Sequence, residues 1–116
     1  MKIPKVPNRD VRQYVQSRKL FTGSNLYGVW NVTGEGETRE EWYVVYSYGR
    51  HWPLFIYTNG VWYENEDKYG TTTSKHRSQS HPLCTTVFMP RENMLILAAG
   101  GYQYLARERV LHGVAV

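Results

Sequence analysis

The sequence predicts an α+β fold, in which an antiparallel meander of four to five strands carries short helices from both termini on one face. Three observations lead to this prediction. Aromatic and β-branched residues fill the middle of the chain, an Asn-Gly pair interrupts them at residues 59 and 60, and both flanking segments have helix-compatible patterns. The length of 116 residues suits a single domain, 1–116.

The first 20 residues are basic and predict an arm followed by a helix. Residues 1–7, MKIPKVP, contain two prolines, which favour an extended arm. Asn8 is suited to cap a helix over 8–20, because Val11, Tyr14 and Val15 recur at helical spacing. The cations of this region are candidate contacts for nucleic-acid phosphates. Those of the predicted basic arm are Lys2, Lys5, Arg9 and Arg12.

The sheet is predicted within residues 26–89. Residues 42–48, WYVVYSY, are largely apolar at both alternating sets of positions, which is typical of a central strand covered on both faces. Asn59-Gly60 lies between two aromatic runs and predicts a type I′ hairpin turn. Pro53 is expected to begin its strand, where a missing N–H costs least. A further short strand is expected in CTTVFM, residues 84–89.

Residues 90–112 predict a helical C-terminal segment. Pro90 suits a first helical turn, and Gly100-Gly101 is expected to end the helix that follows it. A second short helix is expected within residues 102–112. A buried strand over MLILAA, residues 94–99, is the alternative, because so short an apolar run fits either structure.

A polar segment, KYGTTTSKHRSQSHP at residues 68–82, is predicted to lie in a loop over 65–82. Its hydroxyls and cations form the mixture that phosphate groups bind, and Gly70 allows close approach of the backbone. The residues concerned are Thr71, Thr72, Thr73, Ser74, Lys75, His76 and Arg77. The alternative is a solvated loop whose hydroxyls bond to its own backbone.

The predicted hairpin places two further polar residues near this segment. His51 opens the third strand and Asn65 closes the fourth, so a reversal at residues 59 and 60 sets them side by side. The polar segment starts from the same edge of the sheet. We therefore expect His51, Asn65 and the polar segment to converge in one corner.

Other chemistries have weaker support in the residues. The acidic group Glu64, Glu66 and Asp67 suits Mg²⁺ binding or a general base beside His76, and a metal-free ribonuclease would use His76 with Lys75 and a tyrosine. One cysteine and scattered histidines do not form a zinc motif, so no metal and no cofactor are expected. An aromatic series suits either base stacking or the core of the sheet. It comprises Tyr43, Tyr46, Tyr48, Trp52, Tyr57, Trp62 and Tyr63.

The segment from Tyr43 to Pro82 resembles a small uncharacterised domain of bacteriophage and haloarchaeal proteins. The shared motifs are Y-V-V-Y-S-Y-G-x-H-x-P-L at 43–54, W-x-x-N at 62–65 and K-Y-x-x-T-T-S-K-H at 68–76, about a third of the chain. The resemblance implies that His51, Asn65 and residues 72–76 belong to one unit, and that the chain has a viral or mobile-element origin. It implies no activity. Gly70 stands where that pattern usually has serine.

Composition narrows the setting and the function. Cys84 is the single cysteine, so no intrachain disulfide forms and a reducing, cytoplasmic setting is expected, without a leader or a membrane span. The net charge of +4 favours an anionic partner. The leading hypothesis is a binding module for nucleic-acid phosphates. The alternatives are a protein that binds a host protein through exposed aromatics, and a small nuclease that uses His76.

Overall fold

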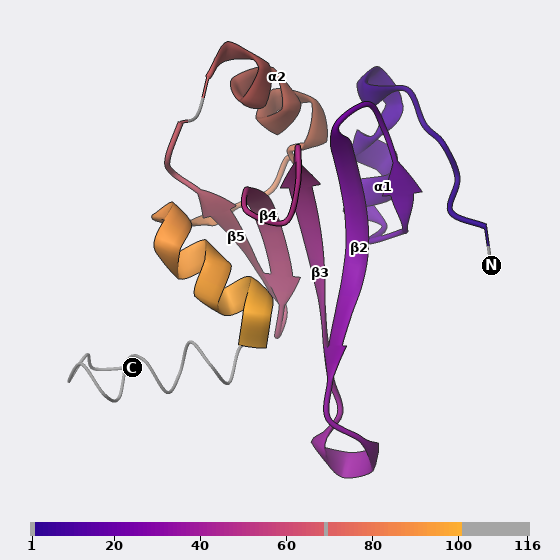
Figure 1. Ribbon diagram of the computed structural model, residues 1–116, viewed down its shortest axis with the longest axis vertical. Helices are drawn as coiled ribbons and strands as arrows, with labels where there is room; N and C mark the ends of the chain where they lie inside the picture. Colours follow the sequence, from indigo (N-terminus) through magenta and orange to yellow (C-terminus); the bar gives the residue numbers. More distant parts are fainter. Residues whose placement is uncertain (1, 69, 101–116) are drawn as a thin grey trace.

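The computed structural model describes residues 2–68 and 70–100 and has a six-stranded sheet with helices on both of its faces (Figure 1). The strands are β1 Phe21–Thr22, β2 Leu26–Thr33, β3 Glu40–Ser47, β4 Pro53–Thr58, β5 Val61–Asn65 and β6 Val87–Met89. The helical elements are η1 Asn8–Asp10, α1 Arg12–Gln16, η2 Gly36–Thr38, α2 Thr71–Ser80 and a helix over 91–100.

The sheet follows chain order, and its last strand departs from the predicted meander. Strands β1 to β5 are antiparallel neighbours, whereas β6 pairs with β5 in parallel. The prediction of four to five strands, all antiparallel, was therefore wrong in number and in the direction of β6. Parallel neighbours need a long crossover connection, and residues 66–86, which contain α2, supply it.

The predicted hairpin is confirmed. Thr58 pairs with Val61, and both turn residues have positive φ angles, 51° at Asn59 and 79° at Gly60, as a type I′ turn requires. Pro53 is the first residue of β4, as expected. The open end of this hairpin therefore carries the 48–52 loop and Asn65.

The helices cover both faces of the sheet, so the prediction that they pack on one face was wrong. Val11 and Val15 pack with Tyr43 and Val45 on one face, and Met94 joins a second core cluster on the other. Figure 1 shows α1 and the helix over 91–100 on opposite sides of the strands. The physical reason is that β3 is buried at every position from 42 to 47, so each of its faces needs a cover.

The N-terminal helix is shorter than the predicted range of 8–20. It consists of η1 and the five residues of α1, and it ends where Arg18 adopts a φ of 51°. The residues before it are extended, as expected, since Val6 N donates to Thr22 O at 2.8 Å. Lys2, Lys5 and Arg9 are exposed on this arm and on η1.

The C-terminal segment resolves the alternative left open at residues 94–99. These residues are helical, and the helix follows Pro90, whose carbonyl accepts a bond from Met94 N at 3.0 Å. Trp42 Nε1 and Asn31 Nδ2 both donate to Ala98 O, which satisfies a carbonyl near the helix end. The second helix expected within 102–112 lies outside the described residues. Within the described ranges, no helix has the length and apolar character of a membrane span.

A close approach between strands surrounds Gly28 in β2. Tyr43 is fully buried, and its hydroxyl donates to Lys19 O at 2.6 Å across this position. Burial raises the pKa of Tyr43. A Cβ on residue 28 would overlap the Tyr43 hydroxyl and lie 2.5 Å from Phe21 Cε1. Glycine is therefore the residue that lets these two rings pack against β2.

Candidate functional site

The polar segment at residues 68–82 contains the helix α2, so the prediction of a loop over 65–82 was wrong for residues 71–80. The inward face of α2 carries Thr73, His76 and Ser80, which are buried polar residues at helical spacing. Because this helix buries no apolar side chain, apolar periodicity does not indicate it. Its position depends on polar contacts with the sheet.

A buried cluster around Glu64 holds α2 against β5. The Glu64 side chain is 3% exposed and accepts contacts from Arg77 Nε at 3.1 Å, from His81 Nε2 at 3.2 Å and from Thr86 Oγ1 at 2.6 Å. Arg77 Nη1 also donates to Asn65 O at 2.9 Å. Arg77, a predicted phosphate contact, thus binds Glu64 and the Asn65 carbonyl of its own chain. A buried carboxylate needs such partners to offset its lost hydration.

Arg12 likewise has an internal role in place of the predicted phosphate contact. Its Nη2 donates to Ser78 O at 2.5 Å and its Nε to His81 O at 2.9 Å. These carbonyls lie at the C-terminal end of α2, where a cation is favoured by the helix dipole. Of the predicted basic arm, Lys2, Lys5 and Arg9 stay exposed, whereas Arg12 fixes α2 to α1.

His76 is buried rather than displayed on a loop. The residue is 4% exposed, and a 2.8 Å hydrogen bond joins its Nδ1 to Ser47 Oγ. Its ring lies beside that of Tyr48, with 5.6 Å between the centroids. Burial, and secondarily the charge of Lys75, lowers the pKa of His76. The ring is therefore neutral at pH 7, and it is enclosed instead of lying on a surface loop as predicted.

We expect the free energy of unfolding to fall as the pH drops below neutrality through the ordinary titration range of histidine. The unfolded chain takes up a proton at His76 before the folded chain does, so acid favours unfolding. The stabilisation is present above the unfolded pKa and declines below it. Urea unfolding at a series of pH values measures this slope, which should shrink in His76→Gln. His51→Gln, at an exposed histidine, is the control, and an equal effect of both variants would contradict the assignment.

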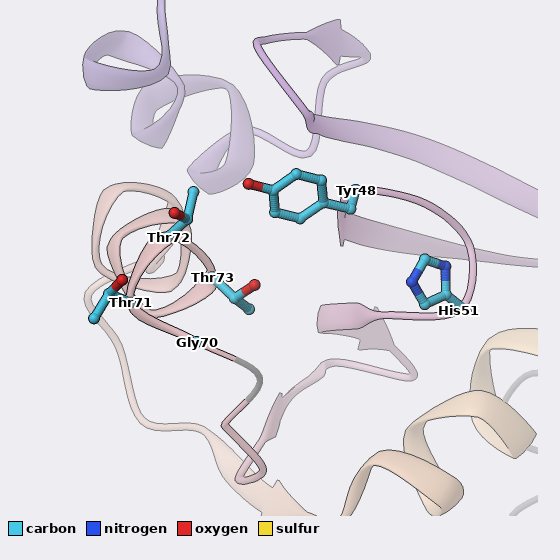
Figure 2. Close-up of a pocket in the computed structure, with 6 residues that line it drawn as sticks. All are labelled: Tyr48, His51, Gly70, Thr71, Thr72 and Thr73. Atoms are coloured by element: carbon cyan, nitrogen blue, oxygen red, sulfur yellow. The ribbon is translucent and has the colours of Figure 1, made fainter.

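A pocket of about 490 Å³ opens between the first turn of α2 and the loop that joins β3 to β4. Tyr48 and His51 line it from the loop, and Gly70 with Thr71, Thr72 and Thr73 lines it from the helix (Figure 2). We call it the α2 pocket. His51 and the predicted threonines therefore share one site. The expected convergence at the hairpin's open end is seen for these residues.

Thr73 is the buried polar group of the α2 pocket. The residue is 3% exposed, and no described residue provides a hydrogen-bond partner for its hydroxyl. Figure 2 shows this hydroxyl pointing toward the space between Tyr48 and His51. The hydroxyl oxygen itself is not among the fully enclosed polar atoms, so it is reached from the pocket, and an acceptor there would give it a hydrogen bond.

The start of α2 gives the pocket a positive electrostatic character. Gly70 is the N-cap residue and supplies no side-chain cap, so the N–H groups of the first turn lack the acceptor that a capping side chain offers. These groups carry the positive end of the helix dipole. Lys75 is exposed one turn further along α2. Such an arrangement favours an anion over a cation.

The opposite wall of the pocket is fixed by backbone contacts. Tyr48 has a φ of 68°, which is unusual for a residue other than glycine, and its N–H donates to Asn25 O at 2.8 Å. His51 O accepts from Arg91 Nε at 2.8 Å, and the Arg91 guanidinium lies 5.2 Å from the Trp52 ring centroid. The loop thus holds Tyr48 and His51 toward α2.

The remaining predicted site residues lie around the pocket or beneath it. Ser74 and Lys75 are exposed on α2 but do not line the pocket. Asn65 is buried, donating to Pro53 O and accepting from Asp67 N. In the acidic group, Glu64 is buried, and Asp67 Oδ2 accepts from Arg91 N. Across residues 2–68 and 70–100, no three metal-ligating side chains gather into a cation site.

The sequence named Tyr48 as one of seven aromatic candidates for base stacking but did not single it out as the exposed one. Of the seven aromatics considered for stacking, five are buried and Tyr57 is half-buried, whereas the Tyr48 side chain is exposed at 46%. The alternation of residues 42–47 gives no sign of this, because the positive φ at Tyr48 breaks the strand just after Ser47.

In comparisons with known proteins, no family model, curated protein or solved structure matches this chain.

Proposed function

We propose that this protein is a nucleic-acid-binding module that contacts phosphate through the α2 pocket. One observation carries the proposal. The hydroxyl of the largely buried Thr73, the first turn of α2 and an exposed tyrosine ring meet in a single pocket. Phosphate oxygens accept from hydroxyls and helix N-termini, and an exposed aromatic ring stacks on a base. The net charge of +4 supports the same partner.

Exposed cations around the molecule add a contribution that does not depend on base sequence. Lys75 on α2 and Lys68 before it are exposed close to the pocket along the chain. Each phosphate that such groups neutralise releases condensed counterions, so salt weakens the binding. Specificity for a nucleic acid over other anions would then come from Tyr48.

The affinity for a single-stranded oligonucleotide is expected to fall with salt, with a slope of about −0.7 in log K against log salt for each phosphate contacted. Thr73→Val should lower the affinity about 10-fold, because a hydrogen bond to a charged group is lost. Fluorescence anisotropy with labelled RNA and DNA measures both quantities. Thr33→Val is the matched control, since Thr33 is exposed at the far end of β2. The proposal would be refuted if the affinity changed neither with the salt concentration nor in Thr73→Val.

A protein partner is the alternative proposal, and one surface favours it. Three apolar side chains are exposed on and before the edge strand β6, with exposed fractions of 63% at Leu83, 43% at Val87 and 57% at Phe88. Exposed apolar groups of this kind mark contact surfaces. A partner that stays bound after nuclease treatment would favour this alternative over the nucleic-acid proposal.

A further inference from the structure

The α2 pocket has features that distinguish one kind of phosphate from another. Its donors converge on a concave space of about 490 Å³, a volume in the range of small-molecule sites. An internal phosphate of a strand is flanked by sugars on both sides and is usually bound on an open groove or surface. A terminal phosphate enters a pocket with only one attached sugar.

Resting on the proposed function, we infer that the α2 pocket takes a terminal phosphate monoester with its adjoining nucleoside. A monoester has three terminal oxygens and approaches two negative charges near neutrality, whereas an internal diester has two such oxygens and one charge. The first-turn N–H groups of α2 and the Thr73 hydroxyl are several donors at one site, and the third oxygen and second charge of a monoester give them a stronger acceptor than a diester does. His51 adds an imidazole on the opposite wall.

Tyr48 is placed to stack on the nucleoside next to that phosphate. Its exposed ring lines the pocket and rests beside the ring of His76, which Ser47 holds by a hydrogen bond. The His76 ring beside Tyr48 is neutral at pH 7, because burial lowers the pKa of His76. A ring with this support needs little ordering when a base stacks on it.

The same chemistry is present in a phosphorylated strand end and in a free nucleoside monophosphate. Both carry a phosphate monoester one sugar away from a base. The two sources differ in that a strand also offers internal phosphates to exposed cations such as Lys75. Competition between them therefore assigns the source without changing the site.

The test compares one single-stranded oligonucleotide with a 5′-phosphate, a 3′-phosphate or hydroxyl ends, by anisotropy at fixed salt. A phosphorylated end is expected to raise the affinity about 10-fold or more, as one or more charge-assisted hydrogen bonds would. Thr73→Val should lower the affinity for the phosphorylated strand more than that for the hydroxyl-ended strand, so that the preference shrinks, whereas the exposed control Thr33→Val should leave the preference unchanged. Tyr48→Asn, which removes the ring but tolerates a positive φ, should reduce the preference without unfolding the chain.

The outcomes separate the two proposals. Equal, salt-dependent affinity for all three strands overturns the inference and leaves the proposed function standing, whereas no binding of any strand overturns both. A nucleoside 5′-monophosphate that competes as well as the phosphorylated strand supports the monoester inference and identifies the small molecule as the ligand. Inorganic phosphate competing equally well would overturn the role of Tyr48.

Discussion

Arg77→Ala is expected to lower the free energy of unfolding by about 3–5 kcal/mol, the range for breaking a buried ion pair from one side. The change removes the guanidinium that binds Glu64 at 3.1 Å and donates to Asn65 O. Glu64 then stays in an almost fully buried position with Thr86 and His81 as its remaining partners. Urea unfolding followed by circular dichroism and tryptophan fluorescence measures the loss.

Arg39→Ala provides the matched control for this measurement. Arg39 pairs with Glu41 at 2.6 Å, a shorter distance, but both side chains are about half exposed. An exposed pair of this kind contributes at most about 1 kcal/mol. If the two variants lost equal stability, burial of Glu64 would not be the cause. The double variant with Glu64→Gln should lose less than the sum of the single changes, because the two side chains form one pair.

Gly28→Ala is expected to lower the free energy of unfolding by about 1–3 kcal/mol or more, the usual cost of overpacking a core. The new methyl group would overlap the Tyr43 hydroxyl and crowd the Phe21 ring. Both rings belong to the core cluster under α1 and have no exposed surface into which they can move. Thermal and urea unfolding measure the change.

Gly70→Ala is the control for Gly28→Ala. A Cβ at residue 70 would extend into open space, and the φ of −179° there suits any residue. This control should therefore change stability by less than about 1 kcal/mol. A loss in Gly70→Ala equal to that in Gly28→Ala would show that steric overlap at β2 is not what destabilises the protein.

The strands were predictable because they carry strong local signals. Residues 26–33 and 40–47 are rich in aromatic and β-branched side chains, and Asn59-Gly60 has few alternatives to a hairpin. The two apolar faces of β3 implied that helices cover both faces of the sheet, yet the prediction placed the helices on one face only. The parallel pairing of β6 depends on a crossover whose helix has no apolar signal.

The candidate site was predictable in part for a related reason. The threonines and His51 could be brought together from the hairpin alone, because its open end fixes their neighbourhood. The inward direction of His76 and Arg77 could not be predicted in this way. It follows from helical spacing, and a segment rich in serine and threonine does not indicate a helix. Tyr48 depends on a backbone angle that no side-chain pattern encodes.

Because α2 is held by polar contacts, its stability against local unfolding is expected to differ from that of the sheet. A helix with poor intrinsic propensity and no apolar anchor is expected to open locally at less cost than the strands beneath it. The pocket wall formed by Thr71, Thr72 and Thr73 would be lost in that open form while the rest of the molecule stayed folded. An anion bound in the α2 pocket would shift this equilibrium toward the folded helix. Binding of the anion and ordering of α2 would therefore be observed together.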